Sequence, residues 1–162
     1  MVELRKITIL DDNAKECIEL DVSPEQTKFV AHNATSLGQA YAIEKRGLGS
    51  RAASYAIYAD KKMVGFIMYG FFKPEYDDDF NESKDYYYFW RFMVDKSQQG
   101  KGYGKAAMTQ IINEIKQKPF GDAEHCYISY EPDNPMKKFY ESYGFVETGQ
   151  VSDGENVAKM KL

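Results

Sequence analysis

The chain has 162 residues, of which 43% are hydrophobic and 15% aromatic, a composition typical of a globular protein with a core. Its 21 basic against 25 acidic residues give a net charge of −4, which argues against nucleic-acid binding because that function requires a basic surface. Two cysteines and two histidines are too few, and too poorly spaced, for a disulfide framework or a metal site. With no signal-peptide pattern and no run of membrane-spanning length, we expect one cytoplasmic domain over residues 1–162 without a membrane partner.

The N-terminal third is predicted to be one strand followed by helices. Alternating residues favour a strand at 3–9, and a helix is expected at 13–20. Ser23, Pro24 and Gln26 have the pattern of a helix start, with serine as N-cap and proline in the first position. Residues 33–47 are predicted to form a further helix that ends at Gly47.

The rest of the chain alternates strands with two further helices. The predicted elements are two strands within 54–72 around a turn at 60–62, a strand at 85–94, a helix at 103–117, a strand at 125–130, a helix from Asn134 to Gly144, and a terminal hairpin around 152–156. This order predicts a mixed α/β fold, in which helices flank a central, mostly antiparallel sheet.

Three alternate glycines, Gly100, Gly102 and Gly104, stand between a predicted strand and a predicted helix. Glycine permits unusual dihedrals and close approach of the main chain, and a helix N-terminus offers N–H donors that suit phosphate. The stretch fits neither the P-loop pattern nor the dinucleotide fingerprint. It therefore indicates another phosphate-bearing ligand, or else only a flexible turn.

Two motifs together resemble one family. The first, "QGKGYG" at 99–104, is similar to the [QR]-x-x-G-x-[GA] signature of the GNAT superfamily of acetyl-coenzyme A-dependent N-acetyltransferases. The second, an asparagine, a tyrosine and Gly-Phe at Asn134, Tyr140 and 144–145, resembles that family's next motif in the expected order. The stretches "WRFMVD", "FVAHN" and "SLGQAY" resemble bacterial diamine or spermine/spermidine acetyltransferases in particular.

The resemblance implies a cofactor site for acetyl-coenzyme A and no metal. Its pyrophosphate is expected at a main-chain cradle formed by Gln99, Gly100, Lys101, Gly102, Tyr103, Gly104 and Lys105. Its pantetheine arm is expected to pair with the backbone of Phe92, Met93 and Val94, where two strands splay apart. Asn134 has two readings of equal weight, a contact to the cofactor and a simple helix N-cap.

Tyr140 is the expected catalytic residue, because the resemblance implies a general acid that protonates the departing thiolate. A phenol titrates near ~10 and a thiol near ~8.5, so the proton transfer is reasonable. The alternative for Tyr140 is core packing on a helix. The base stays open between water and Glu131, for which an exposed strand-end carboxylate is the simpler interpretation, and Trp90 stands where some relatives carry an acid.

An acidic run at 75–85 suggests a cationic acceptor, with Asp77, Asp78, Asp79 and Glu82 as candidate substrate residues, although a solvated loop is the plainer interpretation. The predicted function is direct acetyl transfer from acetyl-coenzyme A to a primary amine of a polyamine or diamine. Two alternatives stay open: another amine, such as an aminoglycoside-type antibiotic, an amino acid or a protein N-terminus, and a coenzyme A-binding sensor without turnover. A homodimer is also open.

Overall fold

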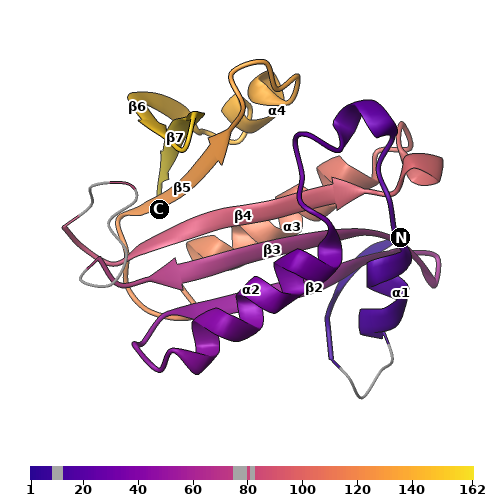
Figure 1. Cartoon of the computed structure of the whole chain (residues 1–162), viewed down its shortest axis with the longest axis horizontal. Helices are drawn as coiled ribbons and strands as arrows, with labels where there is room; N and C mark the ends of the chain where they lie inside the picture. The colour runs from indigo at the N-terminus through magenta and orange to yellow at the C-terminus, as the bar shows by residue number, and fades with distance from the viewer. Residues whose placement is uncertain (9–12, 75–79, 81–82) are drawn as a thin grey trace.

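The computed structural model describes residues 1–8, 13–74, 80 and 83–162, and these residues build one sheet (Figure 1). Its strands are β1 (Val2–Lys6), β2 (Arg51–Ala59), β3 (Lys62–Phe72), β4 (Tyr86–Val94), β5 (His125–Tyr130), β6 (Val146–Ser152) and β7 (Glu155–Lys161). They lie in the order β1-β2-β3-β4-β5-β7-β6, and every neighbouring pair is antiparallel except β4 and β5. The mixed, mostly antiparallel sheet predicted from the sequence is confirmed.

Helices cover both faces of the sheet. α1 (Asn13–Glu19) and α2 (Asn33–Lys45) lie on one face, and α3 (Tyr103–Lys116) lies on the other (Figure 1). The apolar stripe of α3 is fully buried, at Ala107, Met108, Ile111, Ile112 and Ile115. Because both faces are covered, every residue of β3 after Lys62 is buried, as expected for a central strand. Among the described residues, no helix is long and apolar enough to span a membrane.

The sheet opens at its one parallel pair. β4 and β5 are paired only at Tyr87 with Cys126 and at Tyr88 with Tyr127, near the start of each strand. Beyond that point β5 turns away with β7 and β6, as Figure 1 shows. Aromatic side chains from the short helix α4 (Lys137–Glu141) fill part of the opening: Phe139 stacks on Phe92 at 6.0 Å between ring centroids. The predicted splay of these strands is therefore present.

Two predicted helices are shorter in the structure. Residues 23–26 show the predicted start, with Pro24 in the first position and Gln26 accepting from the Ser23 amide at 3.3 Å, but they form only the three-residue 3-10 helix η1 (Pro24–Gln26). The segment after Asn134 begins with a tight turn, in which Asn134 Oδ1 accepts from the Met136 amide at 2.9 Å, and α-helix follows only from Lys137. The predicted strand at 3–9 ends at Lys6, and residue 9 lies outside the described residues.

Candidate active site

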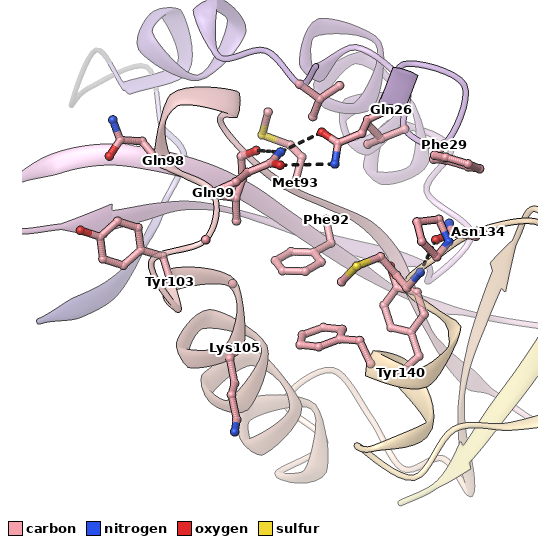
Figure 2. Close-up of a pocket in the computed structure, with 18 of the residues that line it drawn as sticks. Gln26, Phe29, Phe92, Met93, Gln98, Gln99, Tyr103, Lys105, Asn134 and Tyr140 are labelled. Atoms are coloured by element: carbon pink, nitrogen blue, oxygen red, sulfur yellow. Dashed lines mark hydrogen bonds between the residues drawn. The ribbon is translucent and has the colours of Figure 1, made fainter. Parts of the chain in front are cut away.

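A cavity of about 340 Å³ lies on one side of the opening between β4 and β5. Its wall is assembled from η1 and the loop after it, the C-terminal half of β4, the glycine turn, and the segment from Asn134 into α4. Figure 2 shows these side chains around the cavity. The lining residues are Val22, Gln26, Phe29, Val30, Phe92, Met93, Val94, Gln98, Gln99, Gly100, Gly102, Tyr103, Gly104, Lys105, Asn134, Pro135, Met136, Phe139 and Tyr140. The structure thus brings together every predicted cofactor residue except Lys101.

The glycine turn has the geometry of a ligand cradle at two of its three glycines. Gly100 and Gly102 have φ of +76° and +79°, and a Cβ at either would meet nothing within 4 Å. Both therefore combine a left-handed backbone with open space in front of it. Gly104 has a different reason to be glycine: a Cβ there would lie 3.1 Å from the Phe92 ring and 3.4 Å from Val94, so it lets α3 pack closely on β4.

The N-terminus of α3 supplies main-chain donors to this cavity. The first helical bond of α3 runs from the Ala106 amide to the Gly102 carbonyl at 3.2 Å. The amides of Tyr103, Gly104 and Lys105 precede it, so they have no partner within the helix. Helix N–H groups and the positive end of the helix dipole are what a phosphate requires, so these residues fit the pyrophosphate of coenzyme A.

The two lysines of the turn differ in position. Lys105 lines the cavity, whereas Lys101 lies outside it and donates to the Gln98 side chain at 2.9 Å and to the Ser97 carbonyl at 3.3 Å. Lys101 therefore braces the preceding 3-10 helix η2 (Lys96–Gln98) and adds charge near the cavity without facing it.

Gln99 ties the glycine turn to two other elements. Its side-chain amide donates to the Val94 carbonyl at 2.9 Å and to Gln26 Oε1 at 2.8 Å, and Gln26 donates back at 3.3 Å (Figure 2). These bonds hold the segment that contains Gln26 against the glycine turn. Gln26, Phe29 and Val30 also line this cavity and were not predicted to do so, because the helix-start pattern at Ser23 and the resemblance of "FVAHN" gave them no specific role.

The C-terminal half of β4 presents one free edge to the cavity. Phe92, Met93 and Val94 pair with Ile67, Phe66 and Gly65 of β3 on one side. Their other side has no strand neighbour, because the parallel pairing stops at Tyr88, and the Val94 carbonyl accepts from the Gln99 side chain instead. A strand edge without its neighbour offers backbone N–H and C=O groups, so an extended chain can add there. This geometry fits the pantetheine arm.

Tyr140 enters the cavity from α4. Its side chain is buried, and its ring packs on Tyr130 at 5.7 Å and on Phe89 at 6.5 Å between centroids. Burial raises the pKa of Tyr140 to about 12. The phenol therefore stays protonated at neutral pH, as a proton donor must. Gly144, with φ of +99°, ends the helix as predicted.

On the other side of the opening lies a second cavity, of about 430 Å³. It is lined by Gln39, Ile43, Arg46, Phe72, Phe80, Tyr86, Tyr88, Trp90, Arg91, Ser129, Ser152, Asp153 and Glu155. A small cavity of about 50 Å³ lies at the opening itself and shares residues with both: Asn134 and Tyr140 with the first, and Tyr88, Ser129 and Glu155 with the second. The small cavity therefore lies between the two larger ones, and Tyr140 lines it from the side of the first cavity.

The predicted acceptor residues Asp77, Asp78, Asp79 and Glu82 lie outside the described residues. Phe80, in the middle of the same acidic run, is described and lines the second cavity. Glu131, the candidate base, lines none of the three cavities. Among the described residues, no cluster of histidine, cysteine or acidic side chains could hold a metal ion.

A mixed sheet opened at its parallel pair, with a glycine turn beside the opening, is the architecture implied for acetyl-coenzyme A-dependent N-acetyltransferases. A family model described as the acetyltransferase (GNAT) family matches residues 15–145, and the chain belongs to this family. It is accordingly an N-acetyltransferase that uses acetyl-coenzyme A.

Individual relatives cover nearly the whole chain. The spermine/spermidine N(1)-acetyltransferase of Bacillus subtilis (strain 168) is 28% identical over 158 residues, which are 95% of this chain and 95% of the relative. A protein named "Probable spermine N(1)-acetyltransferase" from B. subtilis subsp. natto matches to the same extent. The crystal structure of PaiA N-acetyltransferase from Thermoplasma acidophilum in complex with coenzyme A has a TM-score of 0.64 at 16% identity, over 100% of this chain and 99% of that one.

Proposed function

We propose that the protein transfers the acetyl group of acetyl-coenzyme A to a primary amine of a polyamine or diamine. The observation that carries this proposal is the small cavity between the two larger ones, which Tyr140 lines together with residues of the second cavity such as Tyr88 and Glu155. A donor on one side of the sheet and an acceptor on the other can then react in one ternary complex, without a covalent enzyme intermediate.

The proposed donor site is the first cavity. Main-chain groups from Gln99 to Lys105 hold the pyrophosphate, and the free edge of β4 at 92–94 holds the pantetheine arm. Asn134 stabilises the turn before α4 through its bond to the Met136 amide and lines the same cavity, so both of its predicted roles are compatible. Together these contacts direct the acetyl group toward Tyr140.

Tyr140 is the proposed general acid. The amine nitrogen attacks the acetyl carbonyl carbon, the C–N bond forms, and the C–S bond breaks. The Tyr140 hydroxyl, which is protonated at neutral pH, donates its proton to the leaving sulfur. The hydroxyl is later reprotonated from solvent.

The second cavity supports a cationic acceptor. Five aromatic side chains line it, Phe72, Phe80, Tyr86, Tyr88 and Trp90, together with the carboxylates of Asp153 and Glu155. Ammonium groups bind aromatic faces and carboxylates, each contact contributing on the order of 1 kcal/mol. The names of the two Bacillus relatives and the acidic run around Phe80 support the same class of substrate.

A second candidate rests on the two arginines of that cavity. Arg46 and Arg91 also line it, and guanidinium groups favour an anionic ligand. An amine that also carries a carboxylate, such as an amino acid, would satisfy both charges.

A panel of amines decides between these acceptors. We expect thiol release from acetyl-coenzyme A to be fastest with spermidine, spermine or a diamine, and mass spectrometry should find one added acetyl group. Faster turnover of amino acids would establish the second candidate. Coenzyme A binding without thiol release for any amine would mean a sensor rather than a polyamine acetyltransferase.

A further inference from the structure

Three polar side chains from three different strands form a hydrogen-bonded chain beside Tyr140. Tyr88 of β4 and Ser129 of β5 lie 2.8 Å apart, hydroxyl to hydroxyl. The Ser129 hydroxyl also donates to the Glu155 carboxylate of β7. All three side chains line the small cavity at the opening of the sheet, and all three line the second cavity as well. The chain therefore runs along the acceptor side of the reaction centre.

The direction of the hydrogen bonds in this chain is fixed by chemistry. An ionised carboxylate only accepts, so the single Ser129 proton points to Glu155. The Ser129 oxygen must then accept from the Tyr88 hydroxyl. A phenol that donates in this way still accepts on its oxygen, so an ammonium in the small cavity can donate to Tyr88. Each member is thus set to pass a proton toward Glu155.

We propose that Tyr88, Ser129 and Glu155 form the relay that removes the proton from the acceptor ammonium, with Glu155 as the terminal proton acceptor. This proposal rests on the proposed function and identifies the base of that reaction. The ammonium donates one proton to Tyr88, Tyr88 passes its own to Ser129, and Ser129 passes its own to Glu155. The neutral amine nitrogen can then form the C–N bond.

Two protons leave the amine nitrogen during the reaction, and they leave by different routes. A primary ammonium carries three N–H protons and the amide product carries one. The first proton leaves through the relay to Glu155 and then to solvent. The second leaves the nitrogen for solvent as the C–N bond forms, while Tyr140 gives its own proton to the sulfur and takes one back from solvent, so that one proton is released in total. Acid and base therefore lie on different residues.

The groups around Glu155 define its electrostatic setting. Arg46 just after α2, Arg91 of β4 and Asp153 of the β6–β7 turn line the second cavity with it, while Tyr130 and Tyr140 line the small one. Burial lowers the pKa of Arg91, and the charges of Tyr88 and Glu155 act against that shift. The positive charge of Arg91 thus lies in the same cavity as the Glu155 side chain.

The alternative base is less well placed. Glu131 lines none of the three cavities, although it stands only two residues after Ser129 in the sequence. Because Glu131 lines none of these cavities, Glu131→Gln is the matched control for Glu155→Gln. It makes the same chemical change at a carboxylate outside the relay.

The first test compares these two variants with spermidine as the acceptor. We expect Glu155→Gln to lower kcat/KM by about 10²-fold or more at pH 7, and Glu131→Gln to leave it within about twofold. Coenzyme A affinity, measured by calorimetry, should be unchanged in both, which also shows that each variant is folded. A Glu155→Gln enzyme with wild-type kcat/KM would overturn the proposal.

Two further measurements separate a relay from a charge effect. Ser129→Ala keeps the carboxylate but breaks the chain, and it should lower kcat as Glu155→Gln does, which also decides the matter if Glu155→Gln fails to fold. The deficit of either variant should shrink as pH rises toward ~10, where the free amine becomes abundant. Unimpaired turnover of Ser129→Ala, or a deficit independent of pH, would contradict the relay. If instead the wild-type enzyme acetylates no polyamine, the proposed function fails and not the relay alone.

Discussion

The two cavities proposed as donor and acceptor sites are built from different kinds of groups. On the donor side the groups proposed to hold the cofactor are main chain: the positive-φ turn at Gly100 and Gly102, the first amides of α3, and the edge of β4 without a strand neighbour. On the acceptor side they are side chains, and these come from α2, β3, β4, β5 and the β6–β7 hairpin. A site built from main-chain groups suits one constant ligand. A site built from side chains can change its specificity when a single side chain is substituted.

The difference explains why one side could be predicted from the sequence. A main-chain cradle needs glycines at fixed spacing within one short segment, so "GKGYG" carries its signal locally. The acceptor side joins Tyr88, Ser129 and Glu155, which are neighbours only because β5 pairs with β7 and starts beside β4. No short sequence motif predicts that these three residues lie together.

The largest expected effect lies where the two sides meet. Tyr140→Phe keeps the ring and its packing but removes the hydroxyl, so kcat should fall by about 10²- to 10⁴-fold while coenzyme A affinity stays the same. Because the pKa of Tyr140 is about 12, the wild-type rate should not decline between pH 8 and 10 through loss of this proton. Steady-state kinetics and calorimetry check both points. Wild-type kcat in the variant would exclude Tyr140 as the acid.

The second-largest effect is expected in the proposed coenzyme A site. Gly102→Val places a branched side chain on a backbone with φ of +79°, which costs about 1–3 kcal/mol, and it also blocks the cradle. We expect the Kd for coenzyme A to rise at least about tenfold. Gly149→Val is the matched control, since Gly149 has φ of +82° and equal open space but lies in β6, away from this cavity.

Both glycine variants should lose similar stability, and only Gly102→Val should lose affinity. If Gly149→Val weakens coenzyme A binding as much, or if Gly102→Val melts earlier yet binds normally, Gly102 is structural and the cradle is misplaced. Thermal melting and calorimetric titration of both variants give the answer.

A smaller effect is expected at the contact that closes the donor side. Gln26→Ala removes the paired bonds to Gln99, and such bonds contribute about 1 kcal/mol. We expect the KM for acetyl-coenzyme A to rise about fivefold with the polyamine KM nearly unchanged. A double-mutant cycle with Gln99→Ala should show non-additive losses. Fully additive losses would mean that the two side chains act independently.

The smallest effect tests the acceptor side through charge alone. Replacing Asp77, Asp78 and Asp79 with Asn should raise the KM for spermidine about threefold at low salt and leave that for acetyl-coenzyme A nearly unchanged. Because the screening length is about 10 Å at ~0.1 M salt, added salt should erase the difference, and a monoamine should respond less than a triamine. An unchanged spermidine KM at low salt would mean that this run does not steer the acceptor.

Particular residues show how far sequence reasoning reaches. Strong periodicity located the helix at 103–116 and the strand at 125–130 within one residue. The helix start predicted at Ser23 is present but begins only a three-residue 3-10 helix, and the bonds from Gln26 to Gln99, 73 residues away, have no local sequence signal. Gly104 was assigned to ligand approach, although its neighbours Phe92 and Val94 give it a packing reason that only the fold reveals.

The central claim is that donor and acceptor meet at the opening between β4 and β5, and a bisubstrate conjugate tests it directly. Coenzyme A joined through its acetyl group to a spermidine nitrogen would occupy both cavities at once. We predict that the wild-type enzyme binds it at least about 10²-fold more tightly than coenzyme A, because the second site is engaged within one molecule. Gly102→Val and Glu155→Gln should each remove part of that gain. A conjugate that binds no more tightly than coenzyme A itself would contradict the account.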